Sequence, residues 1–158
     1  MELFLSQFVN KVDKKGRISL PSLFRNALPI NSKNEIILYK SLKFNAVEGC
    51  SSNRILEISE RINKLEIFSD DQDDFSTSIF SEIVLTNLDA EGRFLIPDKL
   101  KKHARILKEA KFIGLGHYFQ IWEPEAGDVR QRNSRERLIE QKKTLSSILR
   151  EKNQNNEK

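Results

Sequence analysis

The 158-residue chain is poor in the residue types that most often carry chemistry, with one cysteine, two histidines and six glycines. The single cysteine, Cys50, cannot form a disulfide within the chain, which is typical of a protein kept in a reducing cytosol. With only His103 and His117 beside it, the sequence shows no pattern of a zinc site or of a nucleophile with its base. Gly114 and Gly116 make too short a motif for a glycine-rich phosphate loop. We therefore expect a non-enzyme with no cofactor, no metal and no small-molecule substrate.

Long hydrophobic runs are also missing. No stretch approaches the roughly 20 apolar residues that a membrane-spanning helix needs. The first residues, Met1 to Leu5, have no basic region followed by a long apolar run, so we do not expect them to act as a signal peptide. These absences predict a cytoplasmic protein with no membrane partner.

What the sequence does contain is an internal repeat. Residues 13–21 read Asp-Lys-Lys-Gly-Arg-Ile-Ser-Leu-Pro, and residues 89–97 read Asp-Ala-Glu-Gly-Arg-Phe-Leu-Ile-Pro, 76 positions later. Self-similarity at a fixed spacing indicates two copies of one structural unit. An Asp followed three residues later by a Gly predicts a type I turn closed by a left-handed Gly, which is a common hairpin loop. Alternating apolar residues on either side of the turn predict two strands.

Each copy predicts the same series of elements. Pro21 and Pro97 end the second strand and suit the first turn of a helix. Beyond that helix we expect a second hairpin in each half, from residues 35–39 with 44–48 and from residues 111–115 with 119–123. Short alternating strands predict an α+β fold that is mainly β, in which two halves close one interlocked antiparallel barrel.

An Arg stands one residue past the turn glycine in both copies. Arg17 and Arg93 would lie near the hairpin tips, where they can extend into solvent. A plain hairpin with an Asp–Arg pair across its turn is the alternative interpretation. Folding needs the Asp and the Gly, however, and does not need an Arg twice at the same place.

Charge follows the repeats. Residues 1–50 carry 8 basic and 4 acidic side chains, residues 51–78 carry 3 and 7, and residues 79–158 carry 16 and 12. The two parts that bear the motif are therefore basic and the connector is acidic, as expected if the repeats face a polyanion. Solvated charge that serves only solubility is the alternative.

The remaining segments predict helices. Residues 53–68 have apolar side chains at helical spacing. The acidic run 70–74 fails the EF-hand pattern, so a solvated loop or the acidic N-terminus of a short helix through Ser81 fits better than a metal site. Pro124 opens a basic helical stretch that we interpret as a subunit contact or mobile tail. Residues 151–158 are polar throughout and are predicted to be disordered.

The double motif, its spacing and the small size of the chain resemble the MraZ family of bacterial transcriptional regulators, from Phe4 to about Leu149. The resemblance implies a pseudo-twofold, swapped-hairpin β-barrel of two AbrB/SpoVT-like units with flanking helices. The expected division is a first repeat at residues 1–50, an acidic helical connector at 51–78, a second repeat at 79–123, and a C-terminal helix with a polar tail at 124–158.

The resemblance also implies a site and partners. In that family the Asp-x-x-x-Arg segments contact DNA, which indicates here Asp13, Lys14, Lys15, Gly16, Arg17, Asp89, Gly92 and Arg93. Lys15 matches a basic residue usual in the first motif, whereas the second motif has Glu91 at that place. The implied partners are double-stranded DNA, at direct repeats in the promoter of the division and cell-wall gene cluster, and further copies of the chain in a homo-oligomeric ring. Such a protein would be associated with the nucleoid.

Two other functions stay open at this point. A structural ring or scaffold protein without specific DNA binding would have no reason to place an Arg at both hairpin tips. The antitoxin of a toxin–antitoxin pair also uses AbrB-like folds, but it usually has one copy of the motif per chain and a disordered toxin-binding tail.

Overall fold

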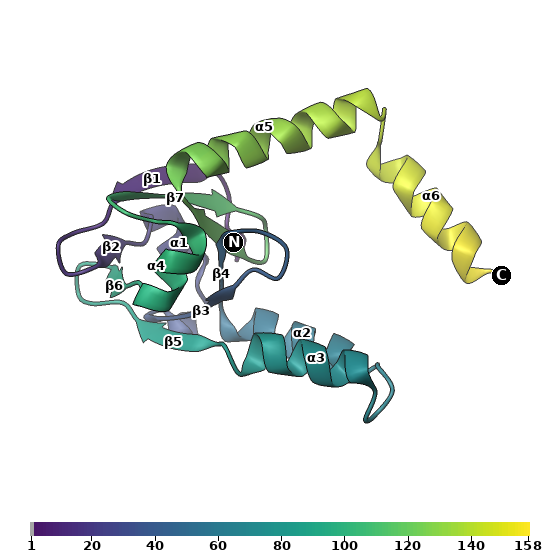
Figure 1. Cartoon of the computed structure of the whole chain (residues 1–158), viewed down its shortest axis with the longest axis horizontal. Coiled ribbons are helices and arrows are strands. Elements are labelled where there is room, and N and C mark those ends of the chain that lie inside the picture. Colours follow the sequence, from purple (N-terminus) through teal and green to yellow (C-terminus); the bar gives the residue numbers. More distant parts are fainter. Residues whose placement is uncertain (1) are drawn as a thin grey trace. The chain divides into compact units, whose positions relative to one another are not determined.

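The structure is an α+β computed structural model that describes residues 2–158. The strands are β1 (Gln7–Lys11), β2 (Arg17–Ser19), β3 (Glu35–Lys40), β4 (Val47–Cys50), β5 (Val84–Asn87), β6 (Arg93–Leu95), β7 (Glu109–Gly114) and β8 (Phe119–Trp122). The helices are α1 (Ser22–Ala27), the 3-10 turn η1 (Ile30–Ser32), α2 (Ser52–Ile62), α3 (Asp70–Phe80), α4 (Asp98–Ala104), α5 (Pro124–Glu140) and α6 (Leu145–Asn156). Six strands form an antiparallel sheet in the order β1-β7-β8-β4-β3-β5. β2 pairs with β6 in a separate two-stranded ribbon, and Figure 1 shows these two strands side by side.

Strand partners are exchanged between the two halves of the chain. β1 of the first half pairs with β7, β5 of the second half pairs with β3, and β4 pairs with β8. In the ribbon the register matches the internal repeat, since Ile18 lies opposite Phe94, 76 positions later in the chain. In the sheet Glu48 lies opposite Gln120. Within residues 2–158 no ladder joins the edge strands β1 and β5, so strand pairing alone does not close the expected barrel.

The main core packs one face of the sheet against the ribbon and against helices α1 and α4. Phe24 of α1 is fully buried at its centre. Its ring centroid lies 5.5 Å from that of Phe4, 5.2 Å from that of Phe119 and 5.7 Å from that of Phe8. Edge-to-face and tilted aromatic pairs at such distances are favourable beyond the area they bury. They anchor α1 against the sheet.

Strand β3 is buried on both faces, which explains its uninterrupted apolar sequence. Ile36 and Leu38 belong to the main core, whereas Ile37 packs in a second cluster with Ile62 of α2 and Ile79 of α3. Helices α2 and α3 lie side by side (Figure 1) and cover this second face. The connector between the repeats is therefore part of the packed structure.

Two predicted boundaries in the first half are wrong. The second strand of the hairpin is Val47–Cys50 and not residues 44–48, because Ser41 holds the preceding residues in a turn through bonds from the backbone N–H groups of Lys43 and Phe44. The helix predicted over residues 53–68 ends at Ile62, the last residue of α2 that reaches the buried cluster.

The acidic run begins a helix, as the second of the two sequence interpretations held. Ser69 caps α3 by accepting a bond from the backbone N–H of Gln72 over 3.2 Å. Three carboxylates, those of Asp70, Asp71 and Asp73, lie in its first turn, where they stabilise the positive end of the helix dipole. Within residues 2–158 no group of three or more histidine, cysteine or acidic side chains could hold a metal ion.

Residues beyond Pro124 form a separate compact unit, Glu125–Lys158, made of α5 and α6. The disorder predicted for residues 151–158 is wrong, since α6 continues to Asn156. A capping box starts this helix, with the Thr144 hydroxyl accepting from the backbone of Ser147 and the Ser147 hydroxyl accepting from the backbone of Thr144, each over 3.1 Å. Polar residues such as Lys, Gln and Glu propagate a helix well once it has started. No helix in the described part of the chain has the length and apolar character needed to cross a membrane.

Candidate nucleic-acid interface

The two Asp-x-x-x-Arg segments form hairpin loops of nearly identical geometry. In the first loop, the Gly16 N–H donates to the Asp13 carbonyl over 3.0 Å, and the Asp13 N–H donates to the Arg17 carbonyl over 2.8 Å. The equivalent bonds of the second loop measure 3.0 and 2.8 Å. The φ angles of Gly16 and Gly92 are +84° and +77°, in the left-handed region that glycine adopts readily. The predicted turn chemistry is confirmed in both copies.

Each Asp carboxylate organises its loop. Oδ1 of Asp13 accepts bonds from the backbone N–H groups of Lys15 and Arg17 over 2.9 and 2.8 Å, and Oδ2 accepts from Arg17 Nε over 2.8 Å. Asp89 makes the same three bonds over 2.9, 2.9 and 3.0 Å. Hydrogen bonds to the charged form, above all from the backbone N–H of the following Arg, hold the pKa of both carboxyls below their usual range. Each carboxylate is therefore ionised at neutral pH and fixes one arginine.

The Asp–Arg pairing that the sequence offered as an alternative is thus present in both loops. It does not use the whole guanidinium. The Asp13 carboxylate pairs with Nε of Arg17, and within residues 2–158 the Nη1 and Nη2 atoms of that arginine have no ion-pair partner. The Arg17 side chain is 34% exposed. An Arg held in this way presents a preorganised fork to two oxygens of a phosphate or to the edge of a guanine base.

The loops differ at the residue before the glycine. In the second loop Glu91 Oε2 lies 3.1 Å from Arg93 Nη2, so this guanidinium faces two carboxylates. The hydrogen bond from Arg93 to Asp89, with the charges of Asp89 and Glu91, raises the pKa of Arg93. Lys15 stands at the equivalent place in the first loop and is exposed, as is Lys14. The first loop is therefore the more positive of the two.

The β2–β6 ribbon brings both arginines to one face. The middle residue of each strand is buried and the flanking residues are more exposed, so the flanking side chains share the outer face. Arg17 lies opposite Leu95, and Arg93 lies opposite Ser19. The two arginines are therefore diagonal neighbours, which lie roughly 7–8 Å apart in an antiparallel pair, within reach of long side chains.

Backbone hydrogen bonds join the two loops into one surface. The N–H of Leu20 donates to the carbonyl of Gly92 over 2.9 Å, and the N–H of Ile96 donates to that of Gly16 over 3.1 Å. Each turn glycine thus accepts a bond from the residue that follows the ribbon strand of the other repeat. The two loops that carry the sequence-predicted site residues flank the ribbon, and we call the outer surface of the ribbon and these loops the ribbon face. Gly16 and Gly92 themselves are buried beneath it.

Sequence reasoning missed two cations beside the ribbon face, Arg25 of α1 and Lys101 of α4. Arg25 Nη1 donates to the carbonyl of Glu91 over 3.4 Å. Lys101 Nζ lies 3.2 Å from the position that a Cβ atom on Gly16 would take. The two cations are 76 residues apart, the same offset as the motifs, and that signal could have found them.

Comparison with known proteins shows the family of the chain. A family model described as "MraZ protein, putative antitoxin-like" matches residues 79–147. The protein named "Transcriptional regulator MraZ" from Pelagibacter ubique is 42% identical over 135 residues, which cover 85% of this chain and 87% of that relative. This chain belongs to the MraZ family.

Other MraZ relatives cover similar shares of the chain. The protein of the same name from Rickettsia akari is 37% identical over 145 residues, 92% of this chain and 97% of the relative. The one from Rickettsia rickettsii is 41% identical over 125 residues, 79% of this chain and 84% of the relative. The MraZ resemblance predicted from the double motif is confirmed.

Proposed function

We propose that this MraZ-family protein is a transcriptional regulator that binds double-stranded DNA through the ribbon face. The observation that supports the proposal most is the placement of Arg17 and Arg93 on one outer face, each fixed by an Asp over 2.8 and 3.0 Å. The major groove of B-DNA admits a two-stranded β-ribbon. The relatives in Pelagibacter and Rickettsia are named transcriptional regulators.

The site residues divide by role. Arg17 and Arg93 contact base edges or phosphates, and the exposed Lys14 and Lys15 contact phosphates. Asp13 is a positioning residue for its Arg, as is Asp89, and Gly16 and Gly92 permit the tight turn. These are the contacts of a binding protein that does no chemistry.

The exchanged strand ladders support an interlocked, pseudo-twofold architecture. In this proposal, residues 1–50 and 79–123 are two AbrB-like repeats that share one barrel. Residues 51–78 are the acidic connector, and residues 124–158 are a C-terminal appendage. The protein acts in the cytoplasm, on the nucleoid.

Affinity requires several ribbon faces. Specific protein–DNA interfaces usually bury about 1,000–2,500 Å² of protein surface, which two short loops cannot supply. Association of chains into a closed ring would present several ribbon faces to one DNA. Linked contacts can raise apparent affinity by about 10²–10⁴ when the DNA sites lie in register with the protein. The DNA partner proposed here is a set of direct repeats in the promoter of the division and cell-wall gene cluster.

Three DNAs test the proposal at fixed salt. The first carries several repeats spaced by about one helical turn, or 10–10.5 base pairs; the second has half a turn inserted between repeats; the third has one repeat. We expect tight binding to the first alone, with light scattering showing a mass above that of one chain. Equal affinity for all three DNAs, or tight binding by a monomer, would overturn the multivalent mechanism. Footprinting on the DNA upstream of the protein's own gene would locate the site.

A further inference from the structure

The turn glycine of the second loop lies under a cation from the first half of the chain. Arg25 is carried by α1, which the buried Phe24 anchors in the core. A Cβ atom on Gly92 would overlap the guanidinium of Arg25, so the absence of a side chain at Gly92 admits this cation. The guanidinium also donates to the Glu91 carbonyl over 3.4 Å. Arg25 is therefore held directly against the second loop.

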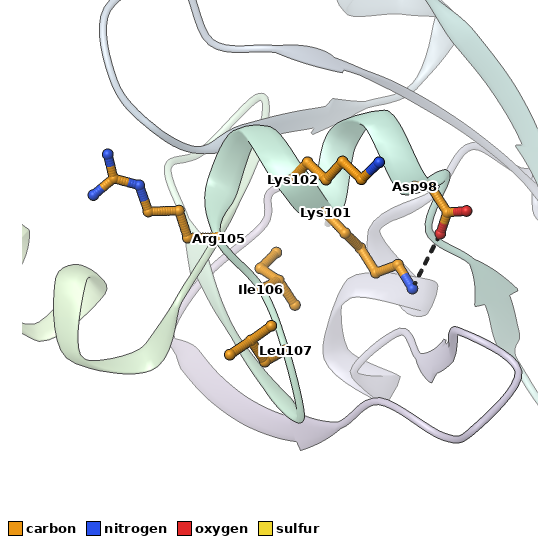
Figure 2. A pocket seen from close by; sticks show the side chains of 6 residues that line it. All are labelled: Asp98, Lys101, Lys102, Arg105, Ile106 and Leu107. Carbon is orange, nitrogen blue, oxygen red and sulfur yellow. Dashed lines mark ion pairs between the residues drawn. The ribbon is translucent and has the colours of Figure 1, made fainter.

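The same arrangement recurs at the first loop with a cation from the second half. Lys101 Nζ would lie 3.2 Å from a Cβ atom on Gly16, and it pairs with Asp98 Oδ1 over 3.4 Å (Figure 2). Lys101 follows Arg25 by 76 residues, as Gly92 follows Gly16. The two cation–glycine contacts are thus equivalent positions of the repeat.

Both cations line hollows in which positive charge exceeds negative charge. A hollow of about 260 Å³ beside the second loop has Arg25 and Lys33 from the first half and Asp89 from the second among its lining residues. A hollow of about 460 Å³ at α4 is lined by Asp98, Lys101, Lys102, Arg105, Ile106 and Leu107 (Figure 2). The hollow beside the second loop therefore combines cations of the first half with a loop of the second. The lining of the α4 hollow comes from the second half alone, and its Lys101 reaches the first loop at Gly16.

We propose that Arg25 and Lys101 bind backbone phosphates of the DNA held by the loop beside them. This inference rests on the proposed function and extends it, because each half of the ribbon face is then a composite of a loop and a helix from different repeats. At the second loop, Arg25 supplies positive charge where Glu91 has replaced the lysine of the first. Phosphate contacts carry no base information, so both cations should strengthen binding to every DNA alike.

The dependence of binding on salt tests this role. Each phosphate contact contributes roughly 0.9 to the slope of log affinity against log salt concentration. We expect Lys101→Gln and Arg25→Gln each to lower that slope by about 1 per lost contact. Each should weaken operator and random DNA by the same factor, while the melting temperature stays near that of the wild type. Lys101→Arg and Arg25→Lys should restore the slope, which a purely structural loss would not allow.

Lys99→Gln is the matched control for Lys101→Gln, because both variants remove one positive charge from α4. Lys99 Nζ lies 3.5 Å from Glu82 and is 50% exposed. A second measurement needs no variant: in the wild-type protein, bound DNA should protect Lys101 from an amine-acylating reagent more than it protects Lys99, as read by mass spectrometry.

The outcomes separate this inference from the proposed function. The inference would be overturned if the variant that carries both Arg25→Gln and Lys101→Gln had the salt slope of the wild type. It would also be overturned if Lys101→Gln lost no more affinity than Lys99→Gln. In either case, a strong loss of DNA affinity in Arg17→Ala would still support the ribbon face as the DNA site. Unprotected Lys101 in the wild-type complex would overturn it too. If the wild-type protein binds no DNA, both proposals fall.

Discussion

Arg93 Nη2 lies 3.1 Å from Glu91 Oε2, an ion pair that the first loop lacks because Lys15 occupies the position equivalent to Glu91. To contact a phosphate through Nη2, Arg93 must give up its ion pair with Glu91 or hold the phosphate and the carboxylate close together, where the two negative charges repel. The first loop has no such competitor and carries Lys14 and Lys15 instead. We infer that the two loops of one chain contribute unequally to binding.

Replacing Glu91 should therefore raise affinity for DNA. Glu91→Gln removes the competing charge. Glu91→Lys also places a lysine where the first loop has Lys15. We therefore expect the affinity for DNA to be highest for Glu91→Lys, intermediate for Glu91→Gln and lowest for the wild type. Titration of multi-repeat DNA at fixed salt measures this. Glu60→Gln, an equal charge change at an exposed position of α2, is the control and should have a smaller effect. Unchanged affinity in both Glu91 variants would show that the ion pair does not limit the second loop.

Removal of either arginine should weaken DNA binding and leave the fold intact. Arg17 and Arg93 are both partly exposed and lie outside the core clusters. If Arg17 contacts a guanine edge, Arg17→Ala should cost roughly 5- to 150-fold in affinity and alter sequence preference. Arg93→Ala should cost less, because Glu91 already competes for that guanidinium. Electrophoretic titration on operator and scrambled DNA, with melting curves beside it, measures both effects. Wild-type binding by the double variant at an unchanged melting temperature would disprove the site.

The turn glycines should matter for stability itself. Gly16→Val and Gly92→Val place a β-branched residue at φ angles of +84° and +77°, where such side chains are strained. At position 92 the new side chain would also overlap the guanidinium of Arg25, so Gly16→Val is the cleaner test of backbone strain. We expect each to lower the free energy of unfolding by about 1–3 kcal/mol, measured by denaturant titration. Ala90→Val is the control, since it adds the same side chain at an exposed position of the same loop that does not have a positive φ. If Gly16→Val and Gly92→Val were as stable as the wild type and as Ala90→Val, the loops would not depend on a left-handed glycine.

Glu48 should make stability depend on pH. Burial raises the pKa of Glu48, whose Oε1 accepts a bond from Gln120 over 3.1 Å. Because the pKa of Glu48 is raised in the folded state, its protonated carboxyl contributes its full stability at any pH below the ordinary pKa of 4.5. That contribution is lost as the pH rises through the folded-state pKa. Glu48→Gln should therefore melt at a higher temperature than the wild type at pH 7, and the difference should vanish below pH 4.5.

Gln120→Glu provides the opposite test at the same contact. It places a second carboxyl beside Glu48, which like-charge repulsion disfavours when both are ionised. We expect this variant to be less stable than the wild type at neutral pH and to recover in acid. The three proteins are the wild type, Glu48→Gln and Gln120→Glu. If the differences between their melting temperatures were the same at pH 7 as below pH 4.5, the raised pKa of Glu48 would be contradicted.

The sequence by itself determined the two loops. The Asp–Gly turn bond, the three bonds to each Asp carboxylate and the left-handed glycines all lie within five consecutive residues. Local chemistry of this kind does not depend on what the rest of the chain does, so residues 13–17 and 89–93 could be predicted together with their family. The acidic start of α3 is local in the same sense. The misplaced end of α2 and the unforeseen length of α6 show that boundaries were less well determined.

Only the tertiary structure decided how the halves combine. Ile18 pairs with Phe94 across 76 positions, although nothing in either strand excludes a partner within its own repeat. The choice depends on burying the inner residues of β2 and β6 in one core, which is a property of the whole packed unit. That pairing puts both arginines on one face, and the packing of α1 and α4 puts Arg25 and Lys101 over the opposite loops. Cations and glycines so far apart in the chain become neighbours because the core holds both helices in place.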